Sequence, residues 1–193
     1  MSNLPSPIDP PLRTLLGPGP SDVDPRVLAA LAKPTVGHLD PYYLKIMDEL
    51  QGMLRNMFRT ANRMTMAISG TGSAGQVASV ANLVEPGDRV LVCINGVFGG
   101  RLVDMAERAG GEVTKIERPW GEVFTVGEVK EALARVKPRV VAIVLAETST
   151  GAWQPIEEIA AAVRDAGAMM ILDTVTALGG IPVEIDKWQV DAV

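Results

Sequence analysis

The chain has 193 residues, of which 47% are hydrophobic and 21% charged, and it carries a formal net charge of -5 at pH 7. This composition is typical of a folded globular domain with a substantial core. The negative charge and the scattered basic residues argue against a nucleic-acid partner. No apolar run approaches the roughly 18 residues of a membrane span, and the N-terminus lacks the layout of a secretion signal, so we expect a cytoplasmic protein with no membrane partner.

One cysteine and one histidine restrict the chemistry. Cys93 has no partner for an internal disulfide, and it lies in an apolar run, where a thiol is usually a small core residue. A single histidine, His38, excludes a metal site built on several imidazoles and makes a Ser-His-Asp triad hard to support. We therefore expect no metal site and no catalytic role for Cys93.

The N-terminal part is rich in proline. Six of the 14 prolines lie in the first twenty residues, which predicts an extended arm over residues 1–20 with a fixed turn at Gly17-Pro18-Gly19-Pro20. A single domain is expected over residues 21–193. Its first long helix is predicted from Pro41 to Phe58, because apolar residues recur there three and four positions apart, on a face that packs in the core or at an interface: Tyr43, Ile46, Met47, Leu50, Leu54, Met57 and Phe58.

Short apolar runs then alternate with helical patterns. Strands are expected over residues 64–68, 89–94, 112–117, 140–146 and 169–173 and helices over 72–84, 98–109 and 156–167, with a further helix opening at Thr125. Thr125 and Glu128 have the spacing of a capping box. The last two strands read as fully buried, and the second of them ends on a carboxylate, Asp173. Such alternation predicts an α/β fold with a mostly parallel sheet sandwiched by helices.

In sheets of this kind, ligands bind at the carboxyl ends of the strands. The first such end leads into the glycine-rich segment 69–75, whose free N–H groups suit a phosphate and whose Thr71 and Ser73 add hydroxyl donors. The segment also matches G-x-G-x-x-G, but the next strand ends in Asn95-Gly96 rather than in the acidic residue that a dinucleotide ribose requires. The alternative for this loop alone is a tight turn without a ligand.

Two further strand ends carry side chains of interest. Phe98 lies between glycines, where an aromatic ring can stack on a planar ligand, although phenylalanine is more often a core residue. Residues 147–151 place hydroxyl groups after the strand 140–146, and alone they are equally compatible with a simple turn.

Asp173 ends the apolar run 169–173 and is the most informative of these positions. A buried carboxylate without a partner is costly, so a cation is expected beside it. A protonated pyridine nitrogen fits, since an aspartate at that atom maintains the ring as an electron sink. The alternative is a carboxylate that caps the next turn through Thr174 or Val175. Together the four strand ends describe a site for pyridoxal 5'-phosphate.

Seven stretches, in order and over nearly the whole chain, resemble the class V aminotransferases of fold type I, in particular the alanine–glyoxylate and serine–glyoxylate (serine–pyruvate) branch. They are LLGPGPSDVDPRVLAAL, GHLDPYYLKIMDEL, SGTGSAG, ANLVEPGDRVLV, NGVFG, AETSTG and LDTVTALGGIPVEIDKWQVDAV. The resemblance implies an incomplete large domain of that fold, an arm that embraces a second subunit, and therefore a homodimer.

The resemblance also implies residue roles. By resemblance, Thr71, Gly72 and Ser73 bind the cofactor phosphate, and Asp173 pairs with the ring nitrogen. Phe98, at a position where relatives often have tryptophan, stacks on one face of the ring, Val175 packs on the opposite face, and Thr148 forms a hydrogen bond with the cofactor. Gly19 and His38 lie on the substrate side. The Schiff-base lysine of the family is expected beyond Val193, and Lys187 is expected to be solvated. The 193 residues alone are accordingly expected to be inactive.

The activity implied for the full-length protein is ping-pong transfer of an amino group from alanine or serine to glyoxylate or pyruvate. An (S)-ureidoglycine–glyoxylate aminotransferase is the alternative. Such enzymes tend to have glutamine at this position, so the presence of His38 favours alanine or serine as the amino donor. His38 is equally compatible with a loop histidine that binds no substrate. Other classes are a nicotinamide dehydrogenase, which needs the missing ribose acid, a cysteine desulfurase, which needs a mobile cysteine, and a non-catalytic fragment that binds phosphate or a partner.

Overall fold

The computed structural model describes residues 8–193, which divide between Gly37 and His38 into two compact units. In the first unit, residues 8–20 contain no helix or strand, as expected for the arm, whose first seven residues lie outside the described part. The helix α1 (Pro25–Leu31) follows and is capped by Asp24, which accepts a hydrogen bond from the Arg26 N–H. The arm boundary at residue 20 stays a prediction.

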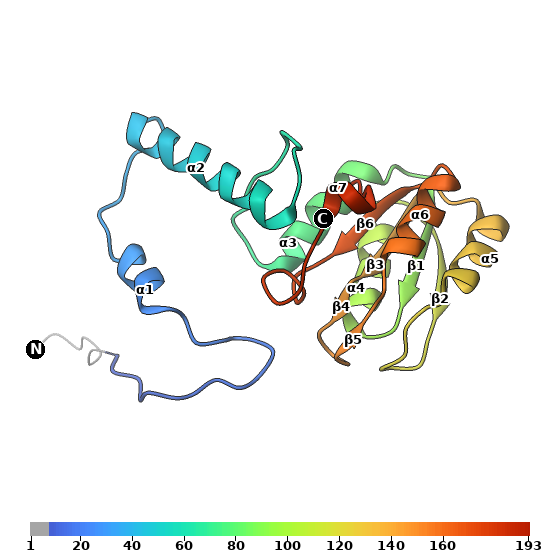
Figure 1. The fold of residues 1–193 in the computed structure, drawn as a ribbon, viewed down its shortest axis with the longest axis horizontal. Coiled ribbons are helices and arrows are strands. Elements are labelled where there is room, and N and C mark those ends of the chain that lie inside the picture. Colours follow the sequence, from blue (N-terminus) through green and yellow to red (C-terminus); the bar gives the residue numbers. More distant parts are fainter. Residues whose placement is uncertain (1–7) are drawn as a thin grey trace, which may run out of the picture. The chain divides into compact units, whose positions relative to one another are not determined.

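The second unit is built on a four-stranded parallel sheet in the order β2-β1-β3-β6 (Figure 1). Its strands are β1 (Arg89–Ile94), β2 (Glu112–Glu117), β3 (Val140–Val144) and β6 (Met169–Asp173). The first two have the predicted bounds, and β6 ends on the predicted carboxylate. The parallel α/β architecture expected from the sequence is confirmed.

A short antiparallel hairpin follows β3 and adds β4 (Ala146–Glu147) and β5 (Ala152–Trp153). The helices of this unit are α2 (Pro41–Phe58), α3 (Gly72–Leu83), α4 (Val97–Arg108), α5 (Val126–Val136), α6 (Glu157–Asp165) and α7 (Ile185–Trp188). The predicted capping box is present at the start of α5, where the Thr125 hydroxyl accepts from the Glu128 N–H and the Glu128 carboxylate accepts from the Thr125 N–H.

Both faces of the sheet are covered by helices, because successive side chains of a strand point to opposite faces. Leu91 and Cys93 of β1 pack with α5 and α6 in one core cluster. Val90 and Val92 of the same strand pack with α3 and α4 in the other. The sandwiched sheet predicted from the alternating runs is therefore confirmed.

One expectation about the first half of this unit is wrong. Residues 64–68 do not form a strand, and Met64 and Met66 are exposed. A strand needs a neighbour for its N–H and C=O groups, and no segment of residues 8–193 pairs with this one. Of the two locations expected for the apolar stripe of α2, the core does not apply, since no residue of this helix is fully buried, although Phe58 packs against the core. The interface stays a prediction. Over residues 8–193, no helix is long and apolar enough to cross a membrane.

Candidate functional site

The carboxyl ends of β1, β3 and β6 meet at one edge of the sheet, and the chain segments that leave them hold most of the predicted site residues. From β1 the chain enters α4 at Val97, and from β3 it enters the β4–β5 hairpin. From β6 it enters a loop that begins with Thr174 and Val175. The helix α3 packs on β6 and supplies the glycine-rich start.

Asp173 is buried at this edge, with 7% of its surface exposed. Its Oδ1 accepts a hydrogen bond from the Val175 N–H at 2.9 Å, and its Oδ2 accepts one from Nε2 of Gln76. Burial raises the pKa of the Asp173 carboxyl, the two hydrogen bonds oppose that rise, and the nearby Glu147 adds to it. The turn-capping bond considered as an alternative is therefore present, but it uses only one oxygen.

The start of α3 lies directly against the loop that follows Asp173. A Cβ atom on Gly72 would lie 2.7 Å from Cγ2 of Val175, so only glycine allows this approach. Thr71 occupies the N-cap position but makes no side-chain capping bond, and the Oγ of Ser73 accepts a hydrogen bond from Arg101 at 3.5 Å. Helix N–H groups in the first turn have no partner within the helix, so this end is suited to an anion.

Phe98 lies in the first turn of α4 and is half-buried. The guanidinium carbon of Arg101, one turn later, lies 4.7 Å from the centroid of the Phe98 ring. Arg101 therefore bridges the predicted ring-stacking residue and Ser73 of the glycine-rich start. On the hairpin side, the Thr148 hydroxyl shares a hydrogen bond with the hydroxyl of Thr176.

The sequence analysis assigned no role to Glu147, which is 1% exposed and fixes the start of α4. Its carboxylate accepts hydrogen bonds from the N–H groups of Phe98 at 3.3 Å and Gly99 at 3.2 Å, and from the hydroxyl of Ser149 at 2.6 Å. The Ser149 hydroxyl in turn accepts from the N–H of Val97 at 3.0 Å. The signal that singled out Asp173, an acid directly after a buried strand, also marks Glu147.

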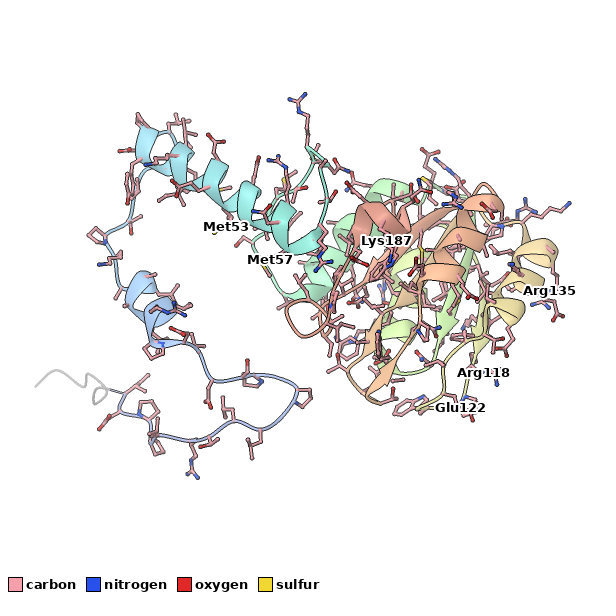
Figure 2. The ribbon with its side chains drawn as sticks, in the orientation of Figure 1. Met53, Met57, Arg118, Glu122, Arg135 and Lys187 are labelled. Atoms are coloured by element: carbon pink, nitrogen blue, oxygen red, sulfur yellow. The ribbon has the colours of Figure 1, made fainter. Side chains whose placement is uncertain are left out.

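Gly19 belongs to the first unit, and its assignment to the substrate side stays a prediction. Two residues of the second unit do not join this group. His38 is exposed at the start of the second unit, and none of the hydrogen bonds above includes it. Lys187 is half-exposed and pairs with Glu157 and Glu184 at 3.3 Å each, so its predicted solvation is confirmed (Figure 2). In the described part of the chain, no three His, Cys, Asp or Glu side chains form a cluster suited to a metal ion.

Comparison with known proteins identifies the family. The model of the aminotransferase class-V family matches residues 15–193, which is nearly the whole chain. The chain belongs to the class-V aminotransferases. It is 44% identical over 182 residues to an (S)-ureidoglycine–glyoxylate transaminase of Bacillus subtilis, covering 94% of this chain and 44% of that protein. It is 42% identical over 182 residues to an alanine–glyoxylate aminotransferase of Drosophila melanogaster, covering 94% of this chain and 46% of that one.

Solved aminotransferase structures have the same fold. A crystal structure of an alanine–glyoxylate aminotransferase from Nostoc sp. superposes with a TM-score of 0.95 at 51% identity, covering 96% of this chain and 49% of that one. The chain thus spans about half the length of the relatives it matches. The expectation that the chain is an incomplete domain of fold type I is confirmed.

Pyridoxal phosphate is the cofactor of this family, and the residues at the strand ends fit it. Asp173 is a buried carboxylate, and within residues 8–193 it accepts hydrogen bonds only from neutral groups. Its negative charge is therefore available to a pyridinium nitrogen. Gly72 leaves the space that a side chain would fill beside Val175, at a helix start suited to a phosphate. The donor set and the charge of the site therefore agree with this cofactor.

Proposed function

We propose that the full-length gene product is an aminotransferase that moves an amino group from alanine or serine to glyoxylate or pyruvate in two half-reactions. The observation that carries this proposal is Asp173, a buried carboxylate that in residues 8–193 is bonded only to neutral donors and is adjacent, through Val175, to the glycine-rich start of α3. A buried carboxylate is costly unless a cation pairs with it, so a cationic ligand is expected beside Asp173.

Pyridoxal phosphate, when bound, supplies an electron sink for negative charge at the α-carbon of the amino acid. In our proposal Asp173 holds the proton on the ring nitrogen, which keeps the ring electron-poor. Thr71, Gly72 and Ser73 hold the phosphate through N–H and hydroxyl donors. Phe98 and Val175 would pack against the ring, and Thr148 would donate a hydrogen bond to the cofactor.

The amino donor has three candidates, alanine, serine and (S)-ureidoglycine. The Bacillus subtilis relative, at 44% identity, is a ureidoglycine–glyoxylate transaminase, and the Nostoc structure, at 51%, is an alanine–glyoxylate aminotransferase. Both names include glyoxylate, which supports glyoxylate as the acceptor here. We propose alanine or serine as the donor and (S)-ureidoglycine as the alternative. Comparison of kcat/KM for the three donors with glyoxylate in the full-length protein decides between them.

The role of Asp173 is tested with Asp173→Asn in the full-length protein. An amide does not hold the ring proton, so we expect turnover of alanine with glyoxylate to fall by roughly a hundredfold or more while pyridoxal phosphate still binds. Asp165→Asn, at a surface carboxylate paired with Arg164, is the matched control and should leave turnover unchanged. Undiminished activity of Asp173→Asn would refute the assignment.

A cysteine desulfurase remains the competing activity on this fold, and solved desulfurases superpose on the chain at 14% identity, which concerns the fold alone. Such an enzyme needs a reactive thiolate. Cys93 is buried in β1, and burial raises the pKa of its thiol to about 12, which keeps it protonated at neutral pH. Cys93 therefore does not supply such a thiolate.

We further propose that the protein is a homodimer in the cytoplasm. Support for the dimer comes from α2, where several large apolar side chains are exposed, among them Tyr42, Leu44, Met53 and Met57. Exposed apolar groups of this size are typical of protein interfaces. The cytoplasmic location rests on the sequence expectation alone.

A further inference from the structure

Gln76 is a buried polar residue that the sequence analysis did not single out. It lies in the second turn of α3 and is 6% exposed. Its Nε2 donates to Oδ2 of Asp173, across 97 residues of sequence. It is therefore the side chain through which α3, the helix with the glycine-rich start, is bonded to the carboxylate at the end of β6.

We propose that Gln76 is a positioning residue, whose amide holds the Asp173 carboxylate in the orientation that binds the ring nitrogen of the cofactor. This inference rests on the proposed function of Asp173.

The two donors to Asp173 fix the plane of its carboxylate. One oxygen accepts from the backbone N–H of Val175 and the other from Gln76. The last torsion of an aspartate has a broad energy profile, so a single donor would leave the group free to turn. With one donor on each oxygen, rotation breaks a hydrogen bond. Each carboxylate oxygen keeps a further lone pair, so the group can still accept from a third donor.

The neutrality of Gln76 also matters. An arginine or lysine at this position would neutralise Asp173 and remove its attraction for a cationic ring. The amide satisfies the oxygen but leaves the negative charge in place. Within residues 8–193, the one charged side chain that acts on Asp173 is Glu147 from β4, and it has the same sign. Gln76 on α3 and the neighbours Thr174 and Val175 are uncharged.

The other half of the Gln76 amide argues against a purely structural role. Its Oε1 atom is buried and has no hydrogen-bond partner among the residues that the structure describes. A buried acceptor without a donor lowers stability, and an apolar side chain of similar size would avoid this loss. The residue is therefore a poor choice for packing, and what it contributes is the bond to Asp173.

The experiment compares two ligands in the full-length protein. One is 4'-deoxypyridoxine 5'-phosphate, and the other is its 1-deaza analogue, in which a carbon replaces the ring nitrogen. Neither forms a bond to a lysine. The ratio of their dissociation constants measures the preference for the ring nitrogen. We expect the wild type to prefer the pyridine and Gln76→Met to reduce that preference about tenfold, the order expected for a lost hydrogen bond to a charged group. Affinity for the deaza ligand should not change.

Asn82→Met on the same helix is the matched control, because it also replaces an amide, but at an exposed position where the amide bonds only to the Ala78 carbonyl. It should leave the preference intact. If Gln76→Met prefers the pyridine as strongly as the wild type does, or weakens both ligands equally, the inference is wrong while the function of Asp173 stands. If the wild type itself shows no preference, the proposed role of Asp173 fails and the inference fails with it.

A second variant covers the case in which Gln76→Met does not fold. In Gln76→Glu the carboxyl has nearly the same shape and can donate to Asp173 only while protonated. The preference for the pyridine ligand should therefore be weak at alkaline pH and should recover as the pH falls. A preference that equals the wild type at every pH would overturn the inference.

Discussion

Asp173 combines a negative charge, burial and bonds only to neutral donors in the described part of the chain. Desolvation disfavours the charged form, and this effect outweighs the stabilisation by the two hydrogen bonds, so the pKa of the carboxyl is raised. Without a bound cation, such a group lowers the stability of the folded protein at neutral pH. A site that is unfavourable when empty and favourable when a pyridinium occupies it is what a cofactor-binding residue requires.

We therefore expect Asp173→Asn to stabilise the cofactor-free full-length protein at neutral pH. Because its folded-state pKa is raised, the folded protein binds this proton more tightly than the unfolded chain does. The carboxyl therefore costs stability above its folded-state pKa, and this cost vanishes as the pH falls below the ordinary value of 3.8, where both states are protonated. We expect a gain on the order of 1 kcal/mol in urea unfolding at neutral pH, decreasing towards acid pH.

The surface change Asp165→Asn serves as the control in these unfolding experiments and should alter stability little. A destabilised Asp173→Asn protein at neutral pH would show that the hydrogen bonds of the carboxylate outweigh its desolvation, contrary to this account.

At the residue scale, the sequence predicted the acid at the end of β6 because its position followed from an apolar run. Gln76 and Glu147 were missed for a physical reason: their partners are 97 and 49 residues away, and no local pattern shows that their side chains meet Asp173 and Phe98. The glycine at position 72 was predicted as part of a phosphate turn, whereas its close approach to Val175 appears only in the folded protein.

At the scale of elements, the start of α4 depends on a neighbouring loop. Gly96 has no side chain to cap this helix, and Glu147 and Ser149 accept hydrogen bonds from its N–H groups instead. A carboxylate at a helix start also interacts favourably with the helix dipole. The backbone of Phe98 is thereby held by the hairpin that carries Thr148.

Gly96→Ala tests this arrangement. The added Cβ would lie 2.3 Å from Cγ of Glu147 and 2.6 Å from Oγ of Ser149, so the capping groups must move. We expect a loss of roughly 1–3 kcal/mol in urea unfolding and weaker binding of 4'-deoxypyridoxine 5'-phosphate as Phe98 shifts.

Gly100→Ala in the same helix is the matched control, because nothing lies within 4 Å of its added Cβ. Alanine favours helix over glycine, so this variant should be stabilised by about 0.5–1 kcal/mol and should bind the ligand normally. Equal behaviour of the two variants would contradict the capping role of Glu147 and Ser149.

The order and type of elements were largely predictable, since helix caps and apolar runs are local signals. The capping box at Thr125 and the buried strands β1, β3 and β6 follow directly from such signals. Residues 64–68 show where this reasoning fails: an apolar run becomes a strand only when another segment pairs with it, and pairing is not visible in the run itself.

At the scale of the whole molecule, the exposed apolar side chains of α2 bear on assembly. Met53 and Met57 are about half-exposed, and four positions apart they share a face of the helix (Figure 2). If that face lies in the proposed dimer interface, Met53→Lys with Met57→Lys should raise the dimer dissociation constant by roughly tenfold or more. Sedimentation velocity of the full-length protein measures this.

Asp48→Lys is the matched control, because Asp48 is exposed, lies on another face of the same helix and changes the charge by the same two units; it should leave the dimer intact. A doubly substituted protein that dimerises like the wild type would remove α2 from the proposed interface, and a monomeric wild type would refute the dimer itself.

The central claim is that the strand-end edge of the sheet holds pyridoxal phosphate with its ring nitrogen at Asp173. A crystal structure of the full-length protein with the cofactor tests it most directly. We predict the phosphate at Thr71–Ser73, the ring between Phe98 and Val175, and the ring nitrogen within hydrogen-bonding distance of the Asp173 carboxylate. A cofactor bound elsewhere, or one whose ring nitrogen does not contact Asp173, would contradict the account.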